Sequence, residues 1–154
     1  DSILRRFRAL YPGRGFPRPS AVLATDEDMM RSSGFSRGKI TSIRDIAEKT
    51  LSGVVPARAT ALKLDDETLI ERLVALRGVG RWTVEMFLIF NLGRPDVLPA
   101  LDLGVRRGFQ IAHRRRQMPK PKVLARHGAR WAPHRTQATL YLWKAADGAA
   151  SPSA

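Results

Sequence analysis

The sequence contains no cysteine, which excludes disulfide bonds, iron–sulfur clusters and cysteine-ligated zinc. No window approaches the roughly 20 apolar residues of a membrane span, and the N-terminus is too charged for a secretory signal. Histidine is also rare. Because His113, His127 and His134 lack the spacing of metal ligands, we interpret them as surface residues. These absences lead us to expect an intracellular, cytoplasmic protein without a membrane partner.

Acidic residues are missing from most of the C-terminal part of the chain. Between Leu103 and Ala146 there are eleven Lys or Arg and no Asp or Glu, and the 154 residues carry a formal net charge of +13. Such a block repels itself in water, so a polyanionic partner is the natural explanation. Nucleic acid is the first candidate and a phospholipid surface the lesser one. A solvated basic face without a partner is the alternative.

Strand-like alternation is almost absent, whereas apolar residues recur at three- and four-residue spacing. We expect helices over residues 4–10, 27–33, 37–52, 66–76, 80–92, 103–112, 120–129 and 134–146. The helix over 80–92 is apolar nearly all round, which predicts that it is central and buried. The sequence therefore indicates an all-α helical bundle, with one domain over residues 1–147 and a disordered tail over 148–154.

The stretch "LRGVGRWTVEMF", residues 76–87, interrupts two helices with a short turn. Gly78 and Gly80 permit positive φ and the close approach of another backbone. The N–H groups of such a turn and of the following helix N-terminus form an anion site, to which Arg81 adds a cation and Thr83 a hydroxyl. An ordinary helical corner, with the glycines serving only the end of the first helix, is the alternative.

The stretch "DVLPALDLGVRRGF", residues 96–109, places Asp102 directly before a helix. The simplest interpretation is an N-cap, which stabilises a helix by about 1 kcal/mol. The helix dipole and the nearby Arg106 and Arg107 also favour an ionised carboxylate there, and we expect these two arginines to contact a nucleic-acid backbone as well. Because a carboxylate repels phosphate within a basic surface, Asp102 is better explained as stabilising a positive charge during a reaction.

Longer stretches carry a family resemblance. "LVALRGVGRWTVEMFLIF" followed by "RPDVLPALDLGVRRGF" resembles the helix-hairpin-helix DNA glycosylases whose motif ends with an aspartate, above all the 3-methyladenine DNA glycosylase II branch. "FSRGKITSIRDIAEKTLSG" and "WAPHRTQATLYLWKAAD" extend the similarity from about Phe7 to Asp147. The resemblance implies a helical glycosylase fold with a helix-hairpin-helix motif, base excision repair as the process, and damaged double-stranded DNA as the partner of a monomeric enzyme.

The resemblance also implies roles in the hairpin. The amides of Gly78 and Gly80 grip a DNA phosphate. Main-chain carbonyls of the family's hairpin hold a monovalent cation, and these map to Val74, Leu76 and Val79. We therefore expect a structural Na⁺ or K⁺ there and no cofactor required for the reaction.

Two further positions matter for chemistry. Asp102 takes the position of the family's catalytic carboxylate. Trp82 stands where bifunctional members carry a nucleophilic lysine, so lyase chemistry is not implied. An aromatic ring there suits the pocket of an extruded, electron-poor base. Packing at the base of the hairpin is an equal alternative for Trp82.

The chain departs from the family pattern in places. Arg77 replaces a common proline, and Leu101 replaces a residue that is often polar or acidic. The chain also begins partway through the family's domain, so the helices that supply the base-flipping wedge and part of the pocket wall are not expected in it.

The expected activity is hydrolysis of the N-glycosidic bond of alkylated purines in duplex DNA by a monofunctional glycosylase. A non-catalytic helix-hairpin-helix DNA-binding module is one alternative, and a glycosylase for mismatched or oxidised bases is another. For a bacterial-type protein, this function implies a location at the nucleoid.

Overall fold

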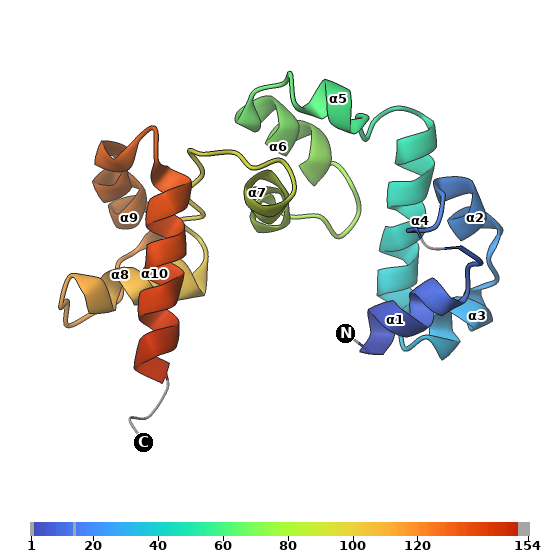
Figure 1. Cartoon of the computed structure of the whole chain (residues 1–154), viewed down its shortest axis with the longest axis horizontal. Helices are drawn as coiled ribbons and strands as arrows, with labels where there is room; N and C mark the ends of the chain where they lie inside the picture. The colour runs from blue at the N-terminus through green and yellow to red at the C-terminus, as the bar shows by residue number, and fades with distance from the viewer. Residues whose placement is uncertain (1, 14, 151–154) are drawn as a thin grey trace. The chain divides into compact units, whose positions relative to one another are not determined.

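The computed structural model describes residues 2–13 and 15–150, and every regular element in them is helical (Figure 1). The all-α prediction is therefore confirmed. The chain divides into two compact units, Asp1–Gly80 and Arg81–Ala154. The prediction of one domain over residues 1–147 stays a prediction. In the described part of the chain, no helix has both the length and the apolar character needed to cross a bilayer.

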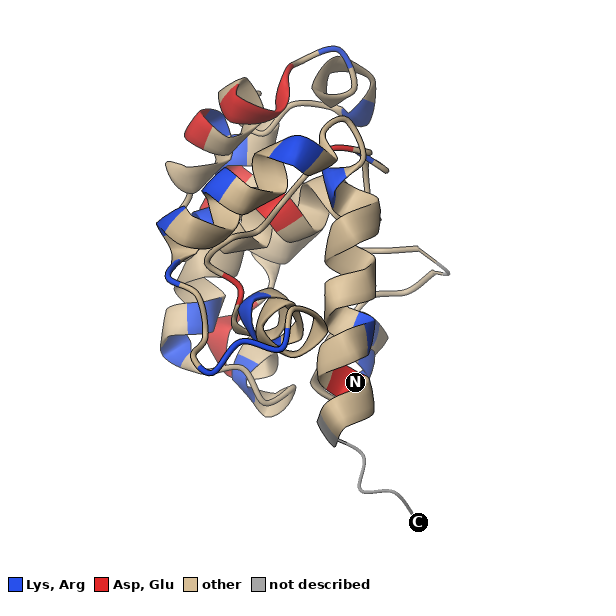
Figure 2. Ribbon diagram, turned by 90° about the vertical axis from the view of Figure 1, so that its left-hand side faces the viewer, with Lys and Arg blue, Asp and Glu red and all other residues tan. Residues whose placement is uncertain are grey.

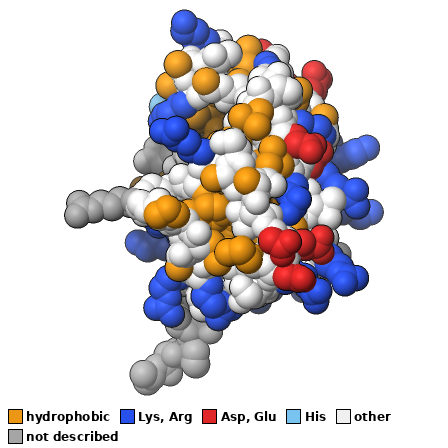
Figure 3. Space-filling view, turned by 90° about the vertical axis from the view of Figure 1, so that its right-hand side faces the viewer, with side chains coloured by type: hydrophobic (Ala, Val, Ile, Leu, Met, Phe, Trp, Pro, Cys, Tyr) orange, Lys and Arg blue, Asp and Glu red, His pale blue; other side chains and the backbone are white. Residues whose placement is uncertain are grey.

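The first unit contains six helices among its described residues. They are α1 (Ser2–Ala9), α2 (Pro19–Ala24), α3 (Glu27–Ser32), α4 (Arg37–Leu51), α5 (Arg58–Ala61) and α6 (Asp66–Val74). Its best-defined core is formed by Phe7, Val22, Met30, Ile40 and Ala47, which come from α1 to α4. Beside it lies an apolar cavity of about 360 Å³ that Phe16, itself 68% exposed, helps to line. Figure 3, a view toward α2 and α4, shows hydrophobic side chains exposed on the face turned to the viewer.

The second unit contains α7 (Arg81–Phe90), α8 (Leu103–Ala112), α9 (Pro121–Gly128), the 3₁₀ turn η1 (Ala129–Trp131) and α10 (Arg135–Ala150). Val105, Phe109, Leu124 and Leu142 form its core. The helices α8 and α10 cross so closely that a methyl group at Gly108 would overlap the main-chain carbonyl of Leu142. This crossing fixes the middle of α8 against the middle of α10.

Short-range signals located most helix starts correctly. The side chains of Asp26, Ser36, Asp65 and Asp102 each accept a hydrogen bond from a main-chain N–H two or three residues later, as expected of N-caps. Sequence periodicity missed α2 and α5, which have only six and four residues. Helices of one turn or so are too short for an apolar repeat to be recognised.

Two expectations need correction. The helix expected over 80–92 runs from Arg81 to Phe90, and it is not buried all round, because Trp82 is 48% and Phe90 68% exposed. At the C-terminus, α10 continues to Ala150, so residues 148–150 of the expected disordered tail are helical. Residues 151–154 of that tail lie outside the described residues.

Candidate active site

Asp102 is the N-cap of α8 and accepts three N–H hydrogen bonds. Its Oδ1 accepts from the main-chain N of Val105 at 2.7 Å and from Nε1 of Trp143 at 2.9 Å. Its Oδ2 accepts from Nε1 of Trp82 at 2.6 Å. Hydrogen bonds to a carboxylate are shorter and stronger than neutral ones. Three of them, from three different elements, fix the orientation of this side chain, which remains partly exposed.

Trp82 lies beside this carboxylate. It comes from the first turn of α7, and its half-exposed ring lies at the surface rather than in the core. Packing alone therefore does not explain it. The structure brings together Trp82 and Asp102, the two residues for which the sequence predicted a catalytic site and its pocket.

Trp143 was missed by the sequence analysis. It lies 41 residues after Asp102, and the only signal for it was its place in the "WAPHRTQATLYLWKAAD" match. Its ring also stacks on Phe90, with centroids 5.8 Å apart and planes 17° from parallel. Trp82, Phe90 and Trp143 thus give the surroundings of Asp102 a largely aromatic character, on which a flat, electron-poor ring can stack.

Gly104 makes this arrangement sterically feasible. A Cβ atom at this position would lie 2.9 Å from Cδ1 of Trp143 and 3.2 Å from Oδ1 of Asp102. Both distances are shorter than ordinary van der Waals contact. The absence of a side chain at Gly104 therefore lets the indole of Trp143 reach the carboxylate.

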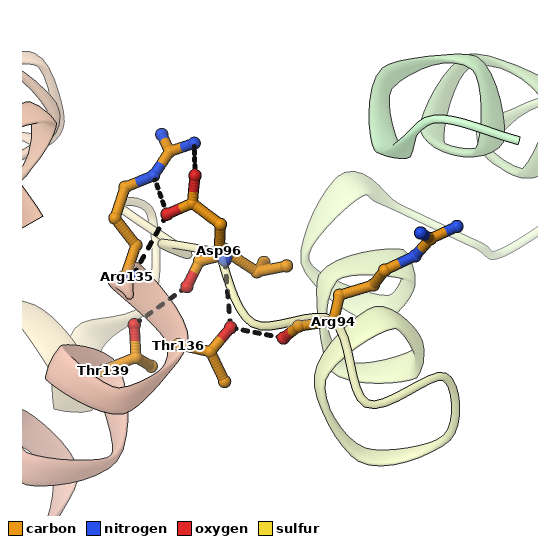
Figure 4. Close-up of polar contacts among 6 residues, drawn as sticks. Arg94, Asp96, Arg135, Thr136 and Thr139 are labelled. Carbon is orange, nitrogen blue, oxygen red and sulfur yellow. Dashed lines mark hydrogen bonds and ion pairs between the residues drawn. The ribbon is translucent and has the colours of Figure 1, made fainter. Parts of the chain in front are cut away.

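The loop that leads to Asp102 is tied to the first turns of α10 (Figure 4). Asp96 accepts from Nε and Nη2 of Arg135 at 2.7 and 2.9 Å, and from the main-chain N of Arg135 at 3.1 Å. These hydrogen bonds to Arg135 hold the pKa of Asp96 below its usual range. The result is a bidentate pair, the strongest form of a carboxylate–guanidinium contact.

Two threonines complete this clamp. Oγ1 of Thr136 donates to the carbonyl of Arg94 at 2.7 Å and accepts from the main-chain N of Val97 at 2.9 Å. The fully buried Thr139 donates to the carbonyl of Val97 at 3.1 Å. The same helix, α10, therefore holds the loop at its start and Asp102, through Trp143, at its end.

The sequence placed two arginines near the carboxylate, but both side chains form hydrogen bonds to other residues. Nε of Arg106 donates to the carbonyl of Pro119 at 2.9 Å, and Nη1 of Arg107 donates to Oε1 of Gln110 at 2.9 Å. Neither side chain is hydrogen-bonded to Asp102. The hydrogen bonds to Asp102 come instead from two indole N–H groups and one main-chain amide, and a role for Arg106 and Arg107 in binding DNA stays a prediction.

Arg81 and Thr83 lie in the first turn of α7. Nε of Arg81 is 3.1 Å from Oε1 of Glu85, whose side chain is almost fully buried. The sequence analysis did not single out Glu85, although its position one turn after Arg81 is the usual spacing for such a pair. Thr83 is exposed. A role for either residue in binding DNA stays a prediction.

The hairpin turn is anchored within the first unit. Gly78 has φ +75°, and a Cβ there would lie 2.5 Å from Oγ of Ser42, so both its backbone conformation and its surroundings require glycine. Gly80 does not adopt positive φ, and no described atom lies within 4 Å of a Cβ built there. The expectation of a conformational need for glycine thus holds for Gly78 and fails for Gly80.

Two side chains of α4 hold this turn. Oδ2 of Asp45 accepts from the main-chain N of Arg77 at 2.7 Å, and Nζ of Lys49 donates to the carbonyl of Ala75 at 3.0 Å. The N–H of Arg77, together with the Lys49 ammonium, lowers the pKa of Asp45. The start of the turn is therefore held in place before any ligand binds.

The carbonyls assigned to a cation lie at and beyond the C-terminal end of α6. Val74 is the last residue of that helix, and Leu76 and Val79 follow it. The carbonyl of Leu76 accepts from the N–H of Val79 at 3.1 Å, which closes the turn. Carbonyl oxygens at a helix C-terminus carry partial negative charge and are partly unsatisfied, so these residues suit a cation that prefers oxygen ligands.

Comparison with known proteins identifies the family. Residues 1–134 match the family described as HhH-GPD superfamily base excision DNA repair protein, and the chain belongs to this superfamily. It is 44% identical over 144 residues to DNA-3-methyladenine glycosylase 1 of Schizosaccharomyces pombe, a match that covers 94% of this chain and 63% of the relative. The chain therefore spans less than two thirds of that relative's length.

Solved structures agree with this assignment. The structure of a 3-methyladenine DNA glycosylase from Schizosaccharomyces pombe in complex with abasic DNA is similar with a TM-score of 0.89 and 43% identity, covering 99% of this chain and 74% of that one. A DNA-3-methyladenine glycosidase from Bacillus halodurans is similar with a TM-score of 0.88 and 37% identity, covering 97% of this chain and 68% of that one. The resemblance seen in the sequence, and the fold that it implied, are confirmed.

Proposed function

We propose that this member of the superfamily is a monofunctional DNA glycosylase that hydrolyses the N-glycosidic bond of alkylated purines in duplex DNA, the first step of their base excision repair. The observation that carries the proposal is the carboxylate of Asp102, held by three N–H groups beside Trp82, Phe90 and Trp143. The names of the similar proteins, 3-methyladenine DNA glycosylases, support the choice of substrate.

The chemistry follows from the charge of the substrate. Alkylation at N3 or N7 places positive charge on a purine, so the base leaves without strong acid catalysis. Departure of the base leaves an oxocarbenium-like sugar, and Asp102 stabilises its positive charge electrostatically and orients the attacking water. Because its donors already fix the carboxylate, little reorganisation accompanies the reaction.

The aromatic rings serve selection. The damaged base leaves the stack, which costs less for a weakened pair, and the cationic purine then stacks against electron-rich rings. Trp82 stands where a lysine nucleophile would be required for lyase chemistry. The product is therefore an intact abasic strand rather than a cleaved one.

The hairpin binds the DNA backbone in this proposal. The amides of Gly78 and Gly80 hold a phosphate, with Arg81 and Thr83 beside them at the start of α7. The carbonyls of the cation site, those of Val74, Leu76 and Val79, hold Na⁺ or K⁺ and stiffen the turn. The protein acts as a monomer on genomic DNA, which in a bacterium is located in the nucleoid.

Product analysis on a panel of duplexes tests this function against its alternatives. Duplexes that contain 3-methyladenine, 7-methylguanine, 8-oxoguanine or a mismatch are incubated with the protein, and released bases are separated from nicked strands. We expect release of methylated purines and no nicking. Release of only oxidised or mismatched bases would favour the second alternative. Tight DNA binding without any base release would favour a non-catalytic module.

A further inference from the structure

The C-terminal end of α8 has an unusual residue in a common turn. The N–H of Arg115 donates to the carbonyl of Gln110 at 2.8 Å, and the N–H of Arg114 donates to that of Ile111 at 3.0 Å. This pair of bonds defines a Schellman motif, in which glycine usually takes the left-handed position. Here that position is Arg114, with φ +48°. Arg114 thus occupies a position at which glycine would adopt the backbone conformation at lower energy.

The turn that follows is rigidly held. The guanidinium of Arg115 lies 5.0 Å from the ring centroid of the buried Phe109. Nε2 of Gln110 donates to the carbonyl of Arg116 at 3.1 Å. Arg106 ties down the end of the turn through its bond to Pro119. The backbone that carries these cations therefore loses little conformational freedom when a partner binds.

The cations around this turn are exposed. We call Arg114, Arg115 and Arg116 the distal basic surface; Lys120, Lys122, Arg126 and Arg130, in and beside α9, are exposed as well. None of them forms an ion pair with a described residue. Figure 2 shows the turn after α8 as a continuous blue stretch of ribbon. The surface therefore carries uncompensated positive charge.

The distal basic surface is separated from Asp102 by the length of α8. Ten residues at about 1.5 Å each place it roughly 15 Å away. Duplex DNA advances about 3.4 Å per base pair, so this distance corresponds to about four to five base pairs. Arg106 and Arg107, nearer to Asp102, are instead used in bonds within the unit.

We propose that the distal basic surface binds the phosphate backbone of the duplex on one side of the lesion, about four to five base pairs from the base that is excised. The proposal rests on the proposed function, because Asp102 marks the position of the lesion. The contact is to phosphates and is independent of sequence. A membrane partner is less suited, because the surface has no exposed large apolar side chains between its cations to insert into a bilayer.

The first test combines a change in the protein with a change in the DNA. The affinity of the full chain is measured for a 21-base-pair duplex with a tetrahydrofuran abasic analogue at its centre, and for two duplexes in which one flank is shortened to three base pairs. The same duplexes are measured with the triple variant Arg114→Gln, Arg115→Gln and Arg116→Gln. A matched control neutralises three exposed cations of the first unit: Arg5→Gln, Arg18→Gln and Lys63→Gln.

The proposal predicts that the two changes are not additive. On the long duplex, the triple variant has a log–log salt slope smaller by about 2 to 3, at about 0.9 per lost phosphate contact. Shortening one of the two flanks weakens the unmodified chain at least tenfold and the triple variant less than twofold. Equal weakening of both proteins by each truncated duplex would overturn the proposal, as would an identical effect of the control variant. If the triple variant loses binding to vesicles of anionic phospholipid while its binding to the duplex is unchanged, the proposal is overturned and the surface is assigned to a membrane instead.

The second test uses Arg114→Gly, which separates a structural role from a binding role. Glycine relieves the left-handed position, so the melting temperature should rise by about 2–4 °C. The affinity for the long duplex should fall and its salt slope should decrease by about one. A higher melting temperature with unchanged affinity for the duplex would show that Arg114 does not contact DNA. Base release from methylated DNA is measured alongside. A chain that excises but shows additive effects refutes only this proposal, whereas a chain that binds but never excises refutes the proposed function.

Discussion

Gly104→Ala separates the geometry of the candidate active site from the stability of the fold. The added methyl would lie 2.9 Å from Cδ1 of Trp143, whereas carbon atoms in contact prefer about 3.5–4.0 Å. The indole must therefore move by about 0.6–1.1 Å. Its hydrogen bond to Asp102 starts at 2.9 Å and would then lie beyond about 3.5 Å, where it is lost.

The effect on activity should exceed the effect on stability. Losing one hydrogen bond to a charged group costs about 1.5–3 kcal/mol, and the better helix propensity of alanine returns up to about 1 kcal/mol. The net loss of stability is therefore about 0.5–2 kcal/mol. A displacement of about 1 Å at a reacting group lowers a rate about 100-fold, so we expect single-turnover excision to fall by about 10- to 100-fold.

The assay is single-turnover release of 3-methyladenine, with thermal unfolding of the same sample. Gly38→Ala is the matched control, since Gly38 lies in α4 and no described atom lies within 4 Å of a Cβ built there. That control should gain stability without losing activity. Excision by Gly104→Ala at the unmodified rate would refute the idea that Trp143 positions Asp102.

Four other substitutions test neighbouring parts of the account. Asp96→Asn should unfold at a lower temperature than the unmodified protein at neutral pH, because it breaks the clamp with Arg135. Since folding lowers the pKa of Asp96, the ionised carboxylate stabilises the protein above about pH 4, and this stabilisation is lost as the pH falls through the lowered pKa. The melting temperatures of the variant and the unmodified protein should therefore converge in acid. Trp82→Ala should lower the rate of excision by more than about tenfold, while the free energy of unfolding falls by less than the 3–5 kcal/mol typical of a buried tryptophan. With the unmodified protein, borohydride should trap no covalent adduct between protein and DNA, and a trapped adduct would contradict the monofunctional assignment. Gly78→Ala should destabilise the protein strongly, whereas Gly80→Ala should preserve the melting temperature and, if its amide approaches a phosphate, weaken DNA binding.

The sequence predicted the parts of the structure that depend on near neighbours. Asp102 was recognised as an N-cap because its bond reaches only three residues along the chain. The positive φ of Gly78 was expected for the same reason, since a tight turn between two helices favours it. Local chemistry was enough to identify Asp102 as a candidate, whereas Trp82 was identified through the family resemblance.

The sequence did not predict the contacts that join distant segments. Trp143 reaches Asp102 across 41 residues, and Arg135 reaches Asp96 across 39, so no local pattern marks either pair. Proximity in sequence was also misleading for Arg106, because its position on α8 directs it to Pro119. These contacts depend on how α8 and α10 cross, which a periodic pattern does not specify.

The central claim is that the oriented carboxylate of Asp102 performs catalysis rather than only capping α8. Asparagine caps a helix about as well as aspartate, so Asp102→Asn keeps the cap at Val105 while it removes the charge and, because an amide nitrogen cannot accept, the bond from Nε1 of Trp82. Asp65→Asn, at the N-cap of α6, is the control for the same substitution at a cap without a catalytic role.

Single-turnover excision of 3-methyladenine by Asp102→Asn, with its affinity for the same duplex, is the most direct measurement. The account predicts a rate lower by at least about 10²- to 10³-fold, the loss typical of removing an electrostatic catalyst. It also predicts equal or tighter DNA binding, because a repulsive charge is gone, and no change in either quantity for Asp65→Asn. Excision by Asp102→Asn at the unmodified rate would contradict the claim.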